Sequence, residues 1–392
     1  MHKTLCLVAL LLAASAAHAL SDSEKEALKS AAEQAYQQQD YATAREKWQT
    51  LAEAGDADAQ HILGYFYYNG QGVAQDYGKA REWWEKAAAQ ENASAANNLA
   101  LLYKEGQGVA QDYGKAREWL EKAAAQGDAA AQYNLGQLYY HGQGVVQDYG
   151  KAREWLEKAA AQGIVDAQYN LGTLYDKGQG VPQDIGKARE WYEKAAEQGN
   201  ADAQYNLGEL YLTGQGVPQD YGKAREWFAK AAAQGDLHAQ YNLGVLYDNG
   251  DGVAQDYGKA RLWYEKAATQ GHAKAQYNLA ILYYQGKGVP QDINEGRKWL
   301  EKAAAQDHAR AQYHLGVLYR DGQGVPQDYG KAREWFEKAA AQDDAQALFN
   351  LGALYYFGID VPKDIGKARE YFAKAAAQGD EGAKKALQQL GK

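Results

Sequence analysis

The sequence predicts an all-α fold, a right-handed superhelical α-solenoid built from antiparallel helix pairs. Three observations lead to this prediction. A 36-residue motif recurs, its apolar residues have helical spacing, and glycines separate two helical stretches within each copy. Residues 131–166 show the motif clearly: AQYNLGQLYYHGQGVVQDYGKAREWLEKAAAQGIVD. Because nine copies run from residue 59 to residue 382 without an insertion or deletion, we expect a stacked array.

The first half of each copy predicts a helix that ends in a turn. Ala131, Leu135 and Leu138 fall on one helical face. Gly142 and Gly144 follow, and glycine adopts a positive φ at little cost. We therefore expect a tight turn between the two helices.

The second half predicts a helix that begins after Asp148, whose carboxylate can accept hydrogen bonds from the free backbone N–H groups. Ala152, Trp155 and Ala159 share one face of this helix, and Gly163 ends it. On the outer surface, pairs such as Glu118–Lys122 and Glu154–Lys158 have the i,i+4 spacing of weak ion pairs, each worth about 0.2–0.5 kcal/mol.

A tryptophan occupies a constant position in the second helix, and we expect it to be buried between adjacent helix pairs. Burying one such ring contributes up to about 4–6 kcal/mol, so Trp227→Ala is expected to cost about 3–5 kcal/mol and to split unfolding into steps. The structural set is Trp119, Trp155, Trp191, Trp227, Trp263, Trp299 and Trp335, preceded by Trp83 and followed by Tyr371.

The motif A-x-A-Q-Y-N-L-G-x-L-Y-x-x-G-x-G-V-x-Q-D-Y-x-K-A-R-E-W-x-x-K-A-A-x-Q-G resembles the Sel-one-like repeat family, a subfamily of the tetratricopeptide-like α-solenoids. The resemblance covers residues 59–382. It implies a superhelix with a concave groove, and an adaptor or scaffold that assembles other proteins, often in bacterial envelopes or at host surfaces.

Some bacterial members of that family are rich in cysteine, carry a disulfide in each helix pair and have been described as binding or hydrolysing β-lactams. The single cysteine here is Cys6, near the N-terminus. The resemblance to that branch is therefore weak. An envelope hydrolase or binder of β-lactam or peptidoglycan fragments remains the alternative function.

Residues 1–19 have the pattern of a signal peptide. Lys3 precedes an apolar run, Leu5–Ala14, and Ala17-His18-Ala19 has the form of a cleavage site. The run is too short for a stable membrane anchor, and no later run is long enough to span a bilayer. We expect export to the periplasm or outside the cell.

The ends of the array predict caps. Residues 20–58 are expected to form N-terminal capping helices, and residues 383–392 a C-terminal capping helix. Polar end units prevent end-to-end association, so we expect a monomer. The formal charge of −9 disfavours nucleic acid as a partner, because the chain would repel a polyanion.

Sites for chemistry are not apparent in the sequence. Five residues separate Gly144 from Gly150-Lys151, whereas a phosphate-binding loop needs four, and Ala152 stands where that loop needs Ser or Thr. The histidines occupy scattered repeat positions, without the spacing of metal ligands. We therefore expect no metal, no cofactor and no catalytic residues.

Recognition is expected on the first helices, which line the groove in the solenoids that this chain resembles. One first-helix position is an almost constant aromatic: Tyr133, Tyr169, Tyr205, Tyr241, Tyr277, Tyr313 and Phe349. An aromatic residue at a constant position favours a role in packing over a role in recognition. If exposed, the same row would form an aromatic ladder for a peptide or a glycan, which makes a glycan-binding solenoid a further alternative.

Two other positions vary strongly between repeats. One contains Val245, Ile281 and Val317 in succession, and the other contains Tyr284 and Tyr356. The variation fits either drift at a solvent position or a partner-binding patch centred on repeats six to eight. We favour the patch, because an apolar strip in solvent lowers solubility. The sequence thus predicts a non-enzymatic scaffold that binds a protein or peptide partner, with Ile281→Asp abolishing capture.

Overall fold

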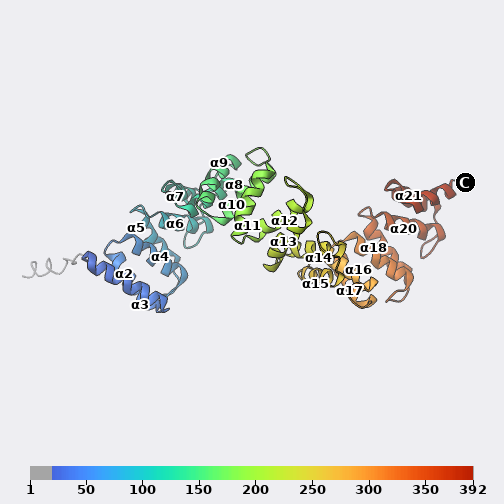
Figure 1. The fold of residues 1–392 in the computed structure, drawn as a ribbon, viewed down its shortest axis with the longest axis horizontal. Coiled ribbons are helices and arrows are strands. Elements are labelled where there is room, and N and C mark those ends of the chain that lie inside the picture. Colours follow the sequence, from blue (N-terminus) through green and yellow to red (C-terminus); the bar gives the residue numbers. More distant parts are fainter. Residues whose placement is uncertain (1–19, 392) are drawn as a thin grey trace, which may run out of the picture. The chain divides into compact units, whose positions relative to one another are not determined.

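The computed structural model describes residues 20–391, and all of its regular structure is helical (Figure 1). The predicted signal peptide, residues 1–19, lies outside the described residues. The helices are α2 (Asp22–Gln37), α3 (Tyr41–Glu53), α4 (Ala57–Asn69), α5 (Tyr77–Ala88), α6 (Ala93–Glu105), α7 (Tyr113–Ala125), α8 (Ala129–His141), α9 (Tyr149–Ala161), α10 (Val165–Lys177), α11 (Ile185–Glu197), α12 (Ala201–Thr213), α13 (Tyr221–Ala233), α14 (Leu237–Asn249), α15 (Tyr257–Thr269), α16 (Ala273–Gln285), α17 (Ile293–Ala304), α18 (Ala309–Asp321), α19 (Tyr329–Ala340), α20 (Ala345–Phe357), α21 (Ile365–Ala377) and α22 (Glu381–Leu390).

The chain divides into two compact units, residues 1–191 and 192–392, with the division inside α11. In each unit, helices from α4 onward alternate between the first and the second helix of a repeat. Each helix packs against its neighbours in sequence: α4 contacts α5 in the first unit, and α18 contacts α19 in the second. This arrangement of stacked helix pairs is the α-solenoid that the 36-residue period predicts. None of the described helices is long and apolar enough to cross a membrane.

Both predicted turn glycines adopt the left-handed conformation. Gly142 ends α8 with a φ of +67°, and Gly144 has the same φ two residues later. A Cβ atom on Gly144 would lie 2.5 Å from the Cβ of Tyr113, at the start of the preceding repeat's second helix. Gly144 is therefore needed both for the turn and for the contact between neighbouring repeats.

The predicted helix caps are also present. The Asp148 carboxylate accepts a hydrogen bond of 2.9 Å from the backbone N–H of Lys151. Asp128 caps the first helix of the same repeat, accepting from the backbone N–H of Ala131 at 2.7 Å. Each helix of the pair thus begins at a side chain that satisfies free backbone donors.

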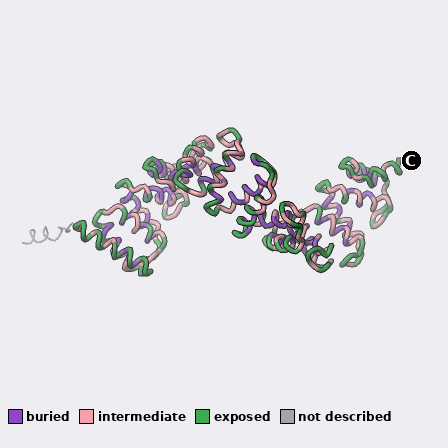
Figure 2. Tube along the Cα trace, viewed as in Figure 1, coloured by how far each residue is buried: buried purple, intermediate pink, exposed green. Residues whose placement is uncertain are grey.

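The buried core follows the inner faces of the helix pairs (Figure 2). In the second helices, the large buried residue is the one directly after the constant tryptophan. These residues, together with the equivalent Trp48 of α3, are at most 5 % exposed: Trp48, Trp84, Leu120, Leu156, Tyr192, Phe228, Tyr264, Leu300, Phe336 and Phe372.

The constant tryptophans are less buried than the sequence suggested. Trp227 is half-buried, as are the others of the set apart from Trp299, which is 8 % exposed. The Nζ atom of Lys230 lies 3.8 Å from the centre of the Trp227 ring, in a cation–π contact. Trp119 does pack against the cores on both sides of it. The rings therefore cover the outer edge of the core. The stabilisation expected for fully buried rings was too large.

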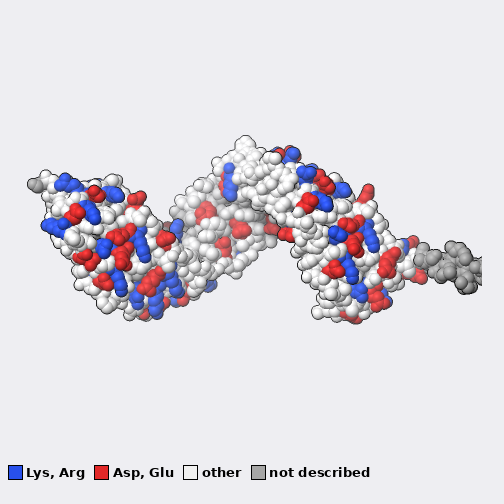
Figure 3. Space-filling model, turned by 180° about the vertical axis from the view of Figure 1, so that it is seen from behind, with Lys and Arg blue, Asp and Glu red and all other residues white. Residues whose placement is uncertain are grey.

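The expected Glu–Lys pairs on the outer surface are replaced by two other contacts. Lys122 and Lys158 lie over the rings of Trp119 and Trp155, at 4.2 and 3.9 Å from the ring centres. The ion pairs come instead from the arginines one position earlier, with Arg153 3.5 Å from Glu157 and an equivalent pair in the preceding repeat. Basic and acidic side chains alternate over this surface (Figure 3).

A row of buried glutamines was missed by the sequence prediction. Gln240 is 4 % exposed, and its amide group donates to the backbone carbonyl of Ala232 at 3.3 Å. Its side-chain oxygen accepts from Gln270 at 2.8 Å. Each such amide satisfies polar groups at the ends of two successive second helices, which explains why a buried polar residue is retained.

Candidate partner-binding face

The first helices carry all of the residues predicted to bind a partner. The constant aromatics of this face are half-buried in both units, from Tyr133 in α8 to Phe349 in α20. Burial raises the pKa of Tyr133, Tyr241 and Tyr277. Their rings are thus partly withdrawn from solvent.

These rings pack on the beginning of the next repeat. The Tyr241 ring stacks on His272 with the ring centres 4.6 Å apart, and Tyr277 stacks on His308 at 4.9 Å. Both histidines are N-cap residues of first helices. The constant aromatic therefore contributes to the contact between repeats, which favours the packing interpretation over a free aromatic ladder.

The histidines occupy scattered repeat positions in the sequence, but the structure brings His238 and His272 together. The rings of His238 and His272 lie 5.2 Å apart in an edge-to-face arrangement. Nδ1 of His272 accepts a hydrogen bond of 3.2 Å from the backbone N–H of Ala275. Across the described residues, no group of three or more His, Cys, Asp or Glu side chains is placed to hold a metal ion.

The variable apolar strip of the second unit is half-buried. Val245 packs against the core of repeats six to eight, and Val317 packs against the core that follows it. Ile281 lies between them in the repeat order, on α16. The strip thus has one side against the core and one side toward the surface of the first helices.

Ile281, Tyr284 and Val317 come together in a cavity of about 420 Å³ between α16 and α18. We call it the repeat 7–8 pocket. Its wall combines these predicted residues with side chains of the two turns and of α17: Ile281, Tyr284, Gln285, Gln291, Ile293, His314, Val317, Leu318 and Gln323.

The polar groups of the repeat 7–8 pocket are uncharged at neutral pH. Burial lowers the pKa of His314, whose Nε2 lies 3.2 Å from the Tyr277 hydroxyl. Gln291 donates to the backbone carbonyl of Tyr284 at 2.7 Å. No Lys, Arg, Asp or Glu is among the residues that line the pocket. Such a wall suits an apolar side chain with peptide groups beside it.

A smaller cavity of about 260 Å³ lies near the C-terminal end, between α20 and α22. Two predicted residues, Phe349 and Tyr356, line it together with Phe357 and Lys385. Five predicted residues of the second unit therefore line two separate hollows of the first-helix face. The other five line neither hollow: Tyr205, Tyr241, Val245, Tyr277 and Tyr313.

Sequence reasoning missed several pocket residues, among them Gln285, Ile293, His314 and Gln323. Gln323 belongs to a turn of regular sequence, which gave no sign of a role. Ile293 did offer a signal, because the same position is Tyr257 and Tyr329 in the adjacent repeats. The replacement of an aromatic by a smaller side chain coincides with the cavity.

Comparison with known proteins agrees with this architecture. The Sel1 repeat family, named above as the Sel-one-like repeat, matches nine consecutive segments: residues 57–92, 93–128, 129–164, 165–200, 201–236, 237–272, 273–308, 309–344 and 345–380. A search of curated proteins found no match.

Solved structures also resemble the chain. One is c5321, described as a protective antigen present in uropathogenic Escherichia coli strains, with 39% identity, a TM-score of 0.84, and coverage of 88% of this chain and 73% of that one. Another is a Sel1 repeat protein from Oxalobacter formigenes, with 34% identity, a TM-score of 0.59, and coverage of 88% and 89%. Sel1 repeat proteins are generally protein-interaction scaffolds. The chain belongs to the Sel1 repeat family.

Proposed function

We propose that this protein is an exported, non-enzymatic scaffold that binds a peptide segment of a partner protein on its first-helix face. The segment would place an apolar side chain in the repeat 7–8 pocket. The observation that carries this proposal is the meeting of Ile281, Tyr284 and Val317 around one cavity. These residues come from two first-helix positions that vary between the repeats of an otherwise regular sequence.

The physical properties of the pocket support peptide binding. Its volume of about 420 Å³ lies within the range of about 300–1,000 Å³ typical of ligand sites. It is formed by packed helices, so little conformational entropy would be lost on the scaffold's side when the partner binds. Its uncharged amides could pair with the backbone of the bound segment.

Peptide display offers a direct test. Random peptides are selected on the wild-type protein and then compared for binding to Ile281→Asp and to a matched control, Leu262→Asp. Leu262 is 46 % exposed on α15 and lies outside the pocket. We expect Ile281→Asp to lose the selected peptides, because it buries a charge against their apolar side chain, and Leu262→Asp to retain them.

The thermal unfolding of the two variants provides the control for folding. Because Ile281 is only half-buried, we expect its replacement to cost about 1 kcal/mol or less. Selected peptides that bind Ile281→Asp as well as the wild type would contradict the proposed site. A large loss of stability would assign Ile281 to the core instead.

Export is the second part of the proposal. It is supported by the charged start, the apolar run and the small residues at 17–19. Mass spectrometry of the protein from fractionated cells should find an N-terminus at Leu20 in the periplasm or the medium. An intact residue 1 on protein confined to the cytoplasm would overturn this part.

A further inference from the structure

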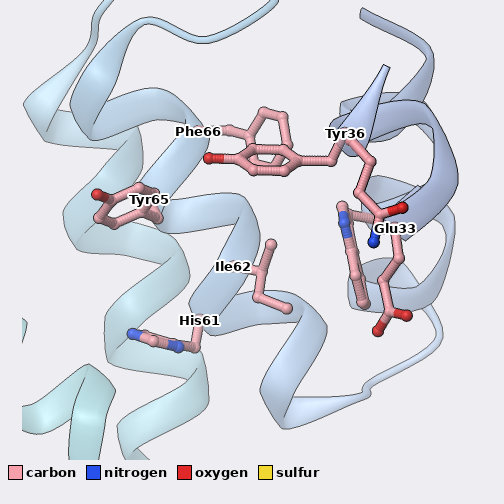
Figure 4. A pocket seen from close by; sticks show the side chains of 8 residues that line it. Glu33, Tyr36, His61, Ile62, Tyr65 and Phe66 are labelled. Atoms are coloured by element: carbon pink, nitrogen blue, oxygen red, sulfur yellow. The ribbon is translucent and has the colours of Figure 1, made fainter. Parts of the chain in front are cut away.

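The first unit contains a cavity of about 440 Å³ between the N-terminal capping helices and the first repeat. We call it the capping pocket. Figure 4 shows Tyr36 and Glu33 reaching it from one side, Tyr65 and His61 from the other, and Ile62 between them. Gln37, Trp48 and Phe66 complete the wall. This site is separate from the repeat 7–8 pocket and does not depend on it.

The wall of the capping pocket is mainly aromatic. Trp48 and Phe66 are buried, whereas Tyr36 is 39 % exposed and Tyr65 is 47 % exposed. The Tyr36 ring makes edge-to-face contacts with Tyr41 and Phe66, at 5.3 and 5.8 Å between ring centres. These contacts hold its orientation. An apolar, mainly aromatic hollow at the surface is typical of a site that binds a ligand or a partner.

The capping pocket has one formal charge, the carboxylate of Glu33. Within residues 20–391, Glu33 makes no ion pair or side-chain hydrogen bond, and it is exposed. Lys29, one turn earlier on α2, is already paired with Asp56 at 3.1 Å.

His61, the one residue of the wall that could become positively charged, does not supply a cation. Burial lowers the pKa of His61, and its Nε2 lies 3.0 Å from the amide nitrogen of Asn98. The ring is therefore neutral at pH 7, and the carboxylate of Glu33 has no positive partner across the cavity.

An apolar, aromatic wall beside an unpaired carboxylate is complementary to a long side chain with a positive end. The aliphatic stem of such a side chain would cover Ile62, and its charged end would meet Glu33 and the tyrosine rings. The protein makes this kind of contact itself, since Lys86 lies 3.9 Å from the centre of the Trp83 ring. An anionic group would be repelled by Glu33, and a purely apolar one would leave the carboxylate unused.

We propose that the capping pocket binds a basic side chain, arginine or lysine, presented by a peptide of a partner protein. Arginine suits it well, because a guanidinium group can stack on an aromatic ring while donating to a carboxylate. The protein would then have a second docking point, of different chemistry from the uncharged repeat 7–8 pocket.

Saturation-transfer difference NMR can test this with small probes. The probes are N-acetyl-arginine amide and N-acetyl-citrulline amide, which have nearly the same shape but differ in charge. We expect saturable binding of the arginine probe, and binding of the citrulline probe at least about fivefold weaker, because it lacks the charge-assisted hydrogen bond.

Matched variants locate the site. Glu33→Gln should weaken binding of the arginine probe about fivefold or more, and so should Tyr65→Ala. Glu26→Gln, the same charge change on the same helix outside the pocket, should leave binding unchanged. Circular dichroism melting confirms that the exposed substitutions leave the fold intact. Equal binding of the two probes, or full binding by Glu33→Gln, would overturn the proposal.

Discussion

Gly208 on α12 lies directly against the ring of Phe228 on α13: a Cβ atom at Gly208 would come within 2.4 Å of the ring carbon Cε1. The residues at these two positions are matched in most repeats, although in repeat three Gly136 faces Leu156. Glycine faces an aromatic ring in five of the described pairs, and alanine stands opposite leucine in two repeats. The pairs are Gly64–Trp84, Gly208–Phe228, Gly244–Tyr264, Gly316–Phe336 and Gly352–Phe372, against Ala100–Leu120 and Ala280–Leu300.

This pairing predicts the sign of a substitution. Alanine is better than glycine inside a helix by about 1 kcal/mol, so propensity alone would make Gly208→Ala stabilising. Because the added methyl group would overlap the Phe228 ring, we expect a net loss of about 1–2 kcal/mol instead. Urea unfolding of the variant measures this difference.

The double variant Gly208→Ala, Phe228→Leu reproduces the alanine–leucine pair of repeats two and seven. We expect the second change to recover most of the stability lost by the first, so a double-mutant cycle should give coupling of about 1 kcal/mol or more. Simple additivity of the two changes would show that the contact does not limit the choice of residue.

The burial of adjacent residues predicts different costs for two substitutions on α13. Phe228 is fully buried, so Phe228→Ala should cost about 3–5 kcal/mol. Trp227 is half-buried, so Trp227→Ala should cost less, about 1–2 kcal/mol. Chemical denaturation of both variants compares them. A larger loss for Trp227→Ala would restore the tryptophan as the main core residue.

His272 predicts a dependence of stability on pH. Burial, together with His238, Lys274 and His308, lowers the pKa of His272 to about 4 from an ordinary value near 6.5. Its neutral ring accepts the capping hydrogen bond from Ala275. The unfolded chain therefore binds a proton more readily, and stability should fall as the pH drops from about 6.5 toward 4.

His272→Asp places at this cap the residue that caps most other helices of the array. The variant should therefore lose less stability than the wild type between pH 7 and pH 5. The difference should be about 1 kcal/mol, once solvent screening of the half-buried ring is allowed for. Thermal melts at the two pH values compare the variant with the wild type. Equal changes of melting temperature with pH in the two proteins would exclude His272 as a source of the pH dependence.

Tyr284 predicts a stabilising substitution. Its hydroxyl is buried and lacks a hydrogen-bond partner in the described part of the chain, and burial raises its pKa. Removing a buried, unsatisfied polar group should relieve a desolvation penalty, so we expect Tyr284→Phe to stabilise the protein by about 0.5–1 kcal/mol. A loss of stability would show that the hydroxyl has a partner, such as an ordered water.

Much of the fold followed from local sequence. The repeat period, the helix caps such as Asp148 and the turn glycines such as Gly144 are local features, because each depends on the backbone conformation of a few neighbouring residues. The lining of the repeat 7–8 pocket, our candidate site, could be predicted only in part. Ile281 and Val317 stood out by their variation, whereas His314 and Gln323 did not.

Only the tertiary structure showed which of two neighbouring residues is buried in the core. Trp227 and Phe228 differ by about 100° around their helix, and both are large and apolar, so helical spacing alone did not show which one faces the next helix. The packing of α12 against α13 buries Phe228 and leaves Trp227 at the edge. The same holds for the repeat 7–8 pocket and the capping pocket. Each cavity forms where side chains from successive helix pairs fail to fill the space between helices, and no single pair contains that information.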